Sequence, residues 1–316
     1  MIKTTLFAFP GQGSQYIGMG KSVFENYKVS KDVFSEVDDA LGYKLSNIIF
    51  GDNAEELTAT YNAQPALMCV SIAVLRALEQ ETGKKIEEMC SIVCGHSLGE
   101  YSALCASGAI TLHDTAKILA IRGKAMNEAA PKGTGGMAAI LGASDEQVEE
   151  LIKKSTISGE VLVIANDNSS GQTVISGHIA SIDKSIEVAK ELGIKRAVKL
   201  PVSGPFHSPL MEKARLEMEK TLVDIRIREP KIPVIANFTA TATTNPDEIR
   251  KLLALQVTGT VKWRESIMYV ENLGYERLFE LGAGKVLGGL TKRIAEKINA
   301  ISIESMDEIL ANKAIL

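Results

Sequence analysis

Apolar residues fall into two kinds of pattern along this chain. Short continuous runs at 4–9 and 91–94 predict buried strands. Between these runs the apolar residues follow helical spacing, most strongly at 66–78. Helical spacing returns after residue 94, breaks near 107–108 and resumes at about 113–130. Strands that alternate with helices are typical of a parallel sheet whose strands are joined by crossover helices.

A different order of elements begins after the glycine-rich segment 131–136. The pattern there predicts a strand, a helix, two strands, a helix and a strand, at 137–141, 145–154, 161–165, 173–176, 179–192 and 196–200. This β-α-β-β-α-β order is that of the ferredoxin-like unit. From residue 201 the α/β pattern resumes, with a helix after the loop of His207, a strand near Val234, a helix after Trp263, a strand at 277–281 and a last major helix. We therefore expect a large α/β core from residues 1–130 and 201–316, with residues 131–200 inserted as a ferredoxin-like subdomain.

Composition excludes several classes of function. Hydrophobic residues make up 45% of the chain and charged residues 23%, as in ordinary globular proteins. The net charge of −4, from 35 basic and 39 acidic residues, argues against general binding to nucleic acid. No stretch approaches the roughly 18 apolar residues of a membrane span, and the apolar run before Pro10 is too short for a signal peptide. We expect a cytoplasmic protein that binds neither nucleic acid nor membrane.

The cysteines give no sign of a metal site or a disulfide framework. All four lie in apolar stretches, without CxxC spacing or neighbouring clusters of histidine, at Cys69, Cys90, Cys94 and Cys105. They are predicted to be reduced core residues. No metal and no resident cofactor are therefore expected.

The segment Gly95–Gly99 has the pattern G-x-S-x-G between an apolar strand and a helix. Two glycines let the chain turn sharply, so that Ser97 is exposed at the end of the strand as a nucleophile. The N–H of Leu98 and the helix N-terminus then face the place where an oxyanion would form. A plain glycine-rich turn is the alternative, and the strand-turn-helix context favours the nucleophile. This turn leads us to expect that the core is α/β-hydrolase-like.

A serine nucleophile needs a base, and His207 is the histidine best placed for that role. It lies in a loop stiffened by three prolines at the expected carboxyl edge of the sheet. His96 is expected to point away from Ser97 as a structural residue, His113 to lie at a helix cap, and His178 to open a helix of the subdomain. The acid that would orient the histidine stays open, because none of the acids between Ser97 and His207 stands in a distinctive loop, and Asp167 comes nearest to one.

Arg122 lies on an apolar helix face, with Ile118, Leu119, Ala125 and Met126 as its helical neighbours. An unpaired buried charge is strongly disfavoured, so the side chain either reaches solvent or meets an anion. No acidic residue shares this part of the face. A carboxylate supplied by a ligand would fit the planar guanidinium.

The segment 11–15 follows the first strand but lacks the spacing of a dinucleotide loop and the lysine of a phosphate loop. A turn of small residues at a strand end can still offer a backbone N–H to an oxyanion.

The sequence as a whole resembles a known family, the malonyl-CoA:acyl carrier protein transacylases of bacterial fatty-acid synthesis. The resemblance extends along essentially the whole chain. Its segments, in order, are FPGQGSQ (9–15), QPAL (64–67), GHSLGEYSAL (95–104), RGKAM (122–126), GTGGMAAI (133–140), GPFHSPLM (204–211) and GKVLGGLTKR (284–293).

The resemblance implies a role for each matching residue. Ser97 would take malonyl from coenzyme A as an ester, and His207 would act as base and later as acid. The N–H groups of Gln12 and Leu98 would form the oxyanion hole. Arg122 would hold the free malonyl carboxylate.

Further positions follow from the same resemblance. Gln256 falls where the family uses a main-chain carbonyl to orient the histidine, although its flanking segment 255–260 departs from the usual pattern. Asn166 and Asn168 would line the cleft. Phe206 resembles the malonyl-selective form of its motif. The implied partners are malonyl-CoA, coenzyme A and an acyl carrier protein, which brings its own phosphopantetheine.

Other functions remain open from the sequence. A serine thioesterase or hydrolase could use the same turn, a polyketide-pathway acyltransferase would differ in its carrier protein, and a non-enzymatic scaffold could keep the fold. Lys285, Lys292 and Arg293 could form a basic patch for an acidic carrier protein or be a solvated helix face.

Overall fold

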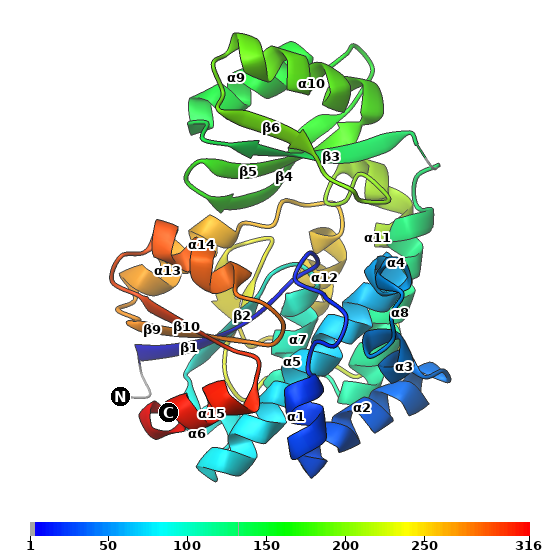
Figure 1. Cartoon of the computed structure of the whole chain (residues 1–316). Coiled ribbons are helices and arrows are strands. Elements are labelled where there is room, and N and C mark those ends of the chain that lie inside the picture. The colour runs from blue at the N-terminus through cyan, green and yellow to red at the C-terminus, as the bar shows by residue number, and fades with distance from the viewer. Residues whose placement is uncertain (1–3, 132) are drawn as a thin grey trace.

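The computed structural model describes residues 4–131 and 133–316 and contains two β-sheets, one above the other in Figure 1. The larger sheet has six strands in the order β10-β9-β1-β2-β7-β8. Its members are β1 (Thr5–Phe9), β2 (Ile92–Gly95), β7 (Val234–Ala236), β8 (Thr241–Thr243), β9 (Arg277–Leu281) and β10 (Asn299–Ile303). All neighbours are parallel except β7 and β8. The sheet is therefore mixed, with an antiparallel strand at one edge.

Helices cover both faces of the larger sheet because its buried strands are apolar on both sides. Phe7 and Phe9 of β1 pack into one cluster, and Leu6 and Ala8 pack into another on the opposite face. The helices that accompany this sheet are α1 (Lys21–Asn26), α2 (Lys28–Leu41), α3 (Leu45–Ile49), α4 (Ala54–Thr58), α5 (Thr60–Thr82), α6 (Ile86–Met89), α7 (Leu98–Ala106), α8 (Leu112–Glu128), α11 (Glu212–Val223), α12 (Pro246–Gln256), α13 (Trp263–Asn272), α14 (Val286–Ile294) and α15 (Met306–Asn312). Short 3₁₀ turns follow at Pro209–Met211 and Lys313–Ile315.

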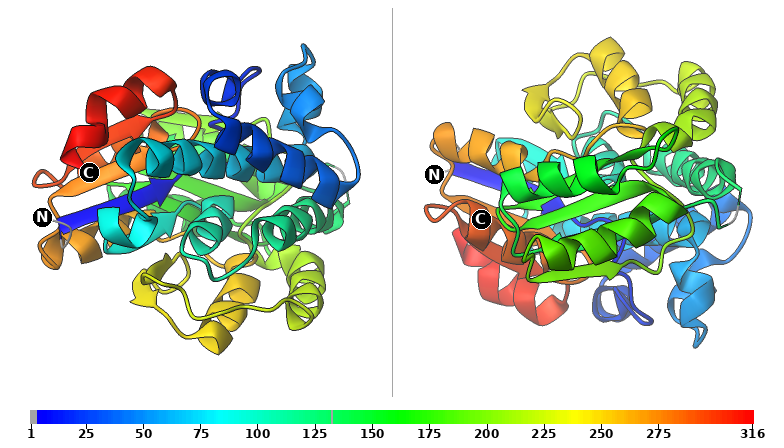
Figure 2. Two further views of the ribbon diagram at one scale, coloured as in Figure 1. Left: turned by 90° about the horizontal axis from the view of Figure 1, so that it is seen from below. Right: turned by 90° about the horizontal axis from the view of Figure 1, so that it is seen from above.

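The smaller sheet is antiparallel and has the order β4-β5-β3-β6. Its strands are β3 (Gly135–Leu141), β4 (Leu162–Ser169), β5 (Gln172–His178) and β6 (Arg196–Lys199). Helices α9 (Asp145–Ser155) and α10 (Ile179–Glu191) lie together on the outer face of this sheet, as both Figure 1 and the view from above in Figure 2 show. The inner face turns Met137, Ala165 and Val174 toward the core of the larger unit.

Strand β4 joins the small sheet to the larger unit at the segment before α13 and at α13 itself. Asp167 N–H donates to Val261 O at 3.0 Å, and Val261 N–H donates to Ala165 O at 2.8 Å. The side chain of Arg264 in α13 pairs with Asp167 at 2.9 Å and with Asp145 at 3.0 Å. These bonds fix the inner face of the small sheet over the carboxyl ends of the parallel strands.

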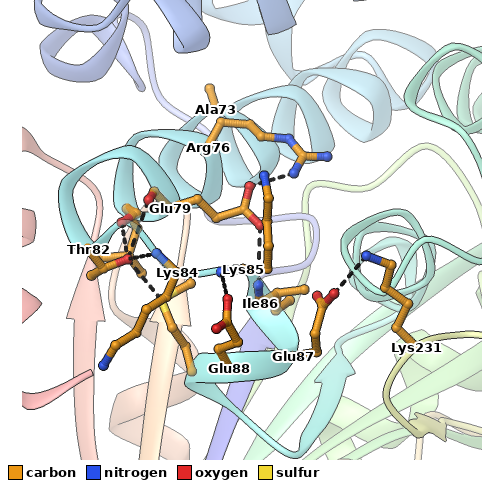
Figure 3. A network of polar contacts seen from close by, with 12 residues as sticks. Ala73, Arg76, Glu79, Thr82, Lys84, Lys85, Ile86, Glu87, Glu88 and Lys231 are labelled. Atoms are coloured by element: carbon orange, nitrogen blue, oxygen red, sulfur yellow. Dashed lines mark hydrogen bonds and ion pairs between the residues drawn. The ribbon is translucent and has the colours of Figure 1, made fainter.

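A polar network holds the opposite end of the larger unit, around the end of α5 (Figure 3). Glu79 accepts from Arg76 at 2.6 Å and from Ile86 N–H at 3.2 Å. Glu87 of α6 pairs with Lys231, ahead of β7, at 2.7 Å. Helix α6, which leads into β2, is thereby bonded to α5 on one side and to the segment ahead of β7 on the other.

The structure confirms most of the expected elements and shows some that the sequence analysis missed. Every strand and helix expected between 137 and 200 is present, within a few residues of its expected bounds. Strands β8 and β10 and helix α15 were not expected. The division of the chain at residues 130 and 201 stays a prediction, and Lys132 in that glycine-rich segment lies outside the described residues.

Helix α7 begins in direct contact with β1. A Cβ added at Gly99 would lie 2.2 Å from Phe9 O, and one added at Gly95 would lie 2.0 Å from the carbonyl carbon of Gly99. Both distances are far shorter than van der Waals contact, and the backbone atoms concerned have no room to move away. Only glycine allows the helix to start this close to the strand.

We therefore expect Gly99→Ala to lower the free energy of unfolding by about 2 kcal/mol or more, as overpacking against backbone does. Gly289→Ala is the matched control, because Gly289 is also helical and a Cβ there would meet nothing within 4 Å. This control should be neutral or stabilising by up to about 1 kcal/mol. Urea unfolding of both variants measures the difference, and equal stabilities would contradict this account of the turn.

Candidate active site

Ser97 lies at the turn between β2 and α7 with a backbone conformation that is unusual for serine. Its φ is 53° and its ψ is −107°. Its own N–H donates to Asn237 Oδ1 at 2.7 Å, and Asn237 Nδ2 donates to Gly95 O at 2.7 Å. Strain of about 1 kcal/mol or more is typical of such a residue, and the surrounding bonds hold it in place. The turn directs the hydroxyl away from the sheet and into the space below the small sheet.

His207 reaches the hydroxyl of Ser97 from a distant part of the chain. Its Nε2 lies 2.8 Å from Ser97 Oγ. The residue lies between β6 and the 3₁₀ turn Pro209–Met211 and also has a positive φ, of 55°. A hydroxyl and an imidazole at this distance form the arrangement in which a base removes the hydroxyl proton.

The other ring nitrogen of His207 meets a main-chain carbonyl instead of an acid. Nδ1 lies 2.8 Å from Gln256 O, so Nδ1 carries the proton and Nε2 is the acceptor. Burial and, to a lesser extent, the nearby positive charge of Arg122 lower the pKa of His207 to about 3, so the ring is neutral. Asp167, the acid considered above, pairs with Arg264 instead.

Arg122 is buried, with 1% of its surface exposed, and does not reach solvent. Its Nη1 donates to Gln64 Oε1 at 2.7 Å, and its Nη2 donates to Gln256 Oε1 at 2.8 Å and to Ser97 Oγ at 3.1 Å. Its guanidinium also lies over the ring of Tyr101, 5.3 Å from the centroid. The partners of this cation are thus neutral groups, and the guanidinium lies next to the hydroxyl of Ser97.

Gln256 connects most of these groups. Its carbonyl bonds the ring of His207, and its side-chain oxygen accepts from Arg122. Its Nε2 donates to Ser97 O at 3.0 Å and to Glu100 Oε2 at 2.7 Å. A single buried residue therefore fixes the histidine, the arginine and the turn that carries the serine.

Sequence reasoning missed three residues of this network. Gln64 and Glu100 stand inside the recognised segments 64–67 and 95–104, but nothing in those segments says what they contact. Asn237 directly follows β7, and the only signal for it would have been the position of β7 beside β2 in the sheet. Long-range contacts of neutral side chains leave no local pattern.

The two N–H groups expected to face an oxyanion are unpaired. Within residues 4–131 and 133–316, neither Gln12 N–H nor Leu98 N–H donates to another protein group. Both residues line the same cavity as Ser97. The close packing of Gly11 on His96, where an added Cβ would be 2.6 Å from His96 O, brings the loop after β1 beside the turn.

A cavity of about 340 Å³ lies between the two sheets. The larger unit contributes Ser97, Arg122 and His207 to its wall, and the small sheet contributes Asn166 and Asn168. The loop residue Phe206 also lines it. The cavity is large enough for a small acyl group and is not closed off from solvent.

The remaining histidines lie away from the hydroxyl of Ser97. His96 Nε2 bonds Asn168 Oδ1 at 2.8 Å, which joins the turn to the small sheet. His113 is exposed in the first turn of α8, whose cap is Thr111, and His178 caps the start of α10. These positions agree with the structural roles expected for the three residues.

Nowhere in residues 4–131 and 133–316 do three or more His, Cys, Asp or Glu side chains gather in a way that would hold a metal ion. The four cysteines are buried and unpaired. Of the helices described, none combines the length and apolar character that a membrane crossing requires.

Comparison with known proteins gives consistent matches. A family model described as "Acyl transferase domain" matches residues 6–287. A malonyl CoA-acyl carrier protein transacylase of Bacillus subtilis is 44% identical over 303 residues, which are 96% of this chain and 94% of that protein. The crystal structure of an acyl-carrier-protein-S-malonyltransferase from Bartonella henselae has 48% identity and a TM-score of 0.95, and the match covers 98% of each chain. A malonyl-transacylase solved in complex with a type II PKS acyl-carrier protein has 35% identity and a TM-score of 0.94, over 99% of this chain and 100% of that one.

The lowered pKa of His207 gives a test of the serine-histidine pair. A histidine at its ordinary pKa near 6.5 would lose its basic form between pH 7 and pH 5. With a pKa of about 3, the ring keeps its basic form across this range. We expect the labelling rate of Ser97 by a fluorophosphonate to stay within about twofold from pH 8 to pH 5. A fall of tenfold or more with a midpoint near 6.5 would contradict the effect of burial.

Proposed function

Because the chain belongs to the acyl transferase domain family, we propose that it transfers malonyl from malonyl-CoA to the phosphopantetheine thiol of an acyl carrier protein. It is an acyltransferase, and it supplies the extender unit for fatty-acid synthesis. The observation that carries this proposal is the buried guanidinium of Arg122, 3.1 Å from the hydroxyl of Ser97. A cation at that distance from the nucleophile selects an acyl group that bears its own carboxylate.

The reaction proceeds through two half-reactions. His207 takes the proton of Ser97 Oγ as this oxygen attacks the thioester carbon of malonyl-CoA, and coenzyme A leaves as its thiol. The carrier protein's thiol then attacks the malonyl ester. His207 accepts the thiol proton and returns a proton to Ser97 Oγ. The bond from His207 Nδ1 to Gln256 O supports this role, since it keeps Nε2 facing the serine in both steps.

The negative charge that forms on the carbonyl oxygen in each step needs donors. We assign these to the N–H groups of Gln12 and Leu98, and the fact that neither donates to a group of the described residues supports the role. Leu98 N–H also belongs to the N-terminus of α7, where the helix dipole favours an anion.

Arg122 holds the malonyl carboxylate. In malonyl-CoA one methylene separates the carboxylate from the thioester carbon, so a carboxylate on the guanidinium brings that carbon close to Ser97 Oγ. Binding the carboxylate also orients the acyl group for attack by a thiol and helps to exclude water. Asn166, Asn168 and Phe206 line the cavity around it, and Asn168 acts on the turn through His96.

We also propose that the fold combines an α/β-hydrolase-like core with a ferredoxin-like subdomain. The order of elements and the strand order β4-β5-β3-β6 support a ferredoxin-like subdomain. The mixed sheet with a strand-turn-helix serine at its carboxyl edge supports an α/β-hydrolase-like core. The absence of a resident cofactor and a cytoplasmic location stay predictions from the sequence.

The carrier protein could belong to a polyketide pathway instead. The similarity to a transacylase solved with a type II PKS carrier protein favours keeping this second candidate. The proposed basic patch remains a hypothesis: Lys285 pairs with Glu308 at 3.0 Å, and Arg293 donates to Gln172 at 2.7 Å. Comparing the kcat/KM for fatty-acid and polyketide carrier proteins separates the two pathways.

Replacing the nucleophile tests the chemistry directly. We expect Ser97→Ala to abolish covalent labelling by radioactive malonyl-CoA, because among the described residues that line the cavity Ser97 is the one hydroxyl in hydrogen-bond contact with a histidine. Ser203→Ala is the control, since that serine follows Val202 of the cavity wall and contacts Thr60 but, within the described residues, no histidine. Labelling of Ser97→Ala at the wild-type level would reject the assignment. A malonyl ester that hydrolyses in water as fast as it transfers to a thiol would favour a hydrolase.

Removing the cation tests substrate selection. We expect Arg122→Ala to lose at least about 100-fold in kcat/KM for malonyl-CoA, the order of one charge-assisted bidentate pair, while acetyl-CoA is used as well as before or better. Arg122→Lys should recover only part of the loss, because lysine lacks the planar fork. Unchanged preference for malonyl-CoA over acetyl-CoA in Arg122→Ala would exclude this role.

A further inference from the structure

A buried carboxyl group lies beneath the site without a cation in contact. Glu100, in the first turn of α7, is 3% exposed. Its Oε2 accepts from Gln256 Nε2 at 2.7 Å and from Asn237 N–H at 3.0 Å. Among the described residues no Lys, Arg or His forms an ion pair with it. Neutral donors alone satisfy this carboxylate.

Arg122 carries a buried positive charge whose hydrogen-bond partners are likewise neutral. Its partners are the side-chain oxygens of Gln64, Gln256 and Ser97, and none of these is an anion. The amide of Gln256 therefore stands between the two charges, accepting from the cation with Oε1 and donating to the carboxylate with Nε2. In the ligand-free protein the buried positive charge and the buried negative charge balance each other through this amide.

Binding malonyl changes this balance. The malonyl carboxylate on Arg122 adds a second negative charge beside the buried side chains of Arg122 and Glu100, where charges interact more strongly than in bulk water. Two carboxylates that share one buried cation favour the protonation of one of them. Glu100 is the carboxyl that stays in place, and its neutral form removes the excess charge.

We propose that the binding of malonyl at Arg122 is coupled to the uptake of one proton by Glu100, which therefore acts as a charge-balancing residue beneath the site. This inference rests on the proposed function. The proton comes from solvent, adds to a carboxylate oxygen of Glu100 and yields the neutral acid. It returns to solvent when the malonyl group leaves on the carrier protein, so no proton is consumed over a full cycle.

The state of Glu100 in the ligand-free protein supports this coupling. Burial raises its pKa to about 7, although the bonds from Asn237 and Gln256 and the charge of Arg122 lower it in part. Both forms are therefore present near neutral pH, and a further negative charge nearby raises the pKa again. Above pH 7 Glu100 is mostly ionised before malonyl binds, so binding requires the uptake of a proton from solvent. The affinity for malonyl therefore falls as the pH rises above 7, by at most about tenfold per pH unit.

Other ionisable groups near α7 are less suited to take up this proton. Burial lowers the pKa values of His207 and His96, so both are neutral, and raises that of Tyr101. Helix α8, which packs against α7, contributes Arg122. The buried thiols nearby already carry their protons, because burial raises their pKa values; they are Cys69 in α5, Cys94 in β2 and Cys105 in α7 itself. Strands β1 and β7 carry no ionisable side chain. His207 is the one competitor, because it too faces the new carboxylate.

The experiment measures protons taken up on binding. The Ser97→Ala protein, which cannot form the ester, is titrated with malonyl-CoA by calorimetry at pH 7.5 in two buffers of different ionisation enthalpy. Acetyl-CoA is the matched ligand, since it carries the same coenzyme phosphates without the carboxylate. We expect uptake of several tenths of a proton with malonyl-CoA beyond the value for acetyl-CoA. The double variant Ser97→Ala, Glu100→Gln should lose this difference and bind malonyl-CoA with an affinity that no longer falls between pH 7 and pH 9.

Two results would overturn the proposal: equal uptake with both thioesters, or a malonyl-specific uptake that persists in Glu100→Gln and thus belongs to His207. If Glu100→Gln does not fold, infrared difference spectra of the Ser97→Ala protein with ¹³C-labelled glutamate decide instead. A protonated-carboxyl band that shifts with the label must then grow with malonyl-CoA and not with acetyl-CoA. Labelling of wild-type Ser97 by malonyl-CoA is measured in parallel, so that a failure of the proposed malonyl transfer can be told from a failure of the proton coupling. Labelling without proton uptake rejects the coupling at Glu100 alone.

Discussion

The guanidinium of Arg122 is held inside the protein without an anion in contact, and the rest of the site is arranged around it. An uncompensated buried charge costs several kcal/mol, so its donors must find acceptors. The side-chain oxygens of Gln64 and Gln256 meet that need. Once Gln256 turns its oxygen toward Arg122, its nitrogen faces Glu100 and the carbonyl of Ser97. The position of one cation thus dictates the orientation of the residue whose main chain holds His207.

The second constraint is the backbone at the two reacting residues. Ser97 and His207 both have positive φ, and Ala240 is the one other described non-glycine residue with that conformation. Strain at these positions persists because the surroundings fix it: Gly95 and Gly99 permit the close start of α7, Asn237 bonds the turn, and Gln256 bonds the imidazole. The serine and the histidine are therefore already within hydrogen-bond distance before any substrate binds. This preorganisation saves the rearrangement that would otherwise add to the barrier of acyl transfer.

Much of this arrangement could be predicted from the sequence, and the limits have physical causes. Strands β1 and β2 are continuous apolar runs because helices cover both faces of their sheet, and the glycine-flanked serine follows directly. Strand β10 was missed because it is an edge strand in which Asn299 and Ser302 interrupt the apolar pattern. The helix face that carries Arg122 holds no acid that could pair with it. Its partners are neutral amides 58 and 134 residues away in the chain, and only the fold brings them together.

The central claim is that Ser97 carries an acyl group whose own carboxylate lies on Arg122. Mass spectrometry of the wild-type protein after incubation with equal amounts of malonyl-CoA, acetyl-CoA and succinyl-CoA tests it most directly, because the thioesters compete for one serine. The account predicts a malonyl adduct in large excess over both others, and peptide mapping should locate it at Ser97. An acetyl adduct of equal abundance, or a malonyl adduct on another residue, would contradict it.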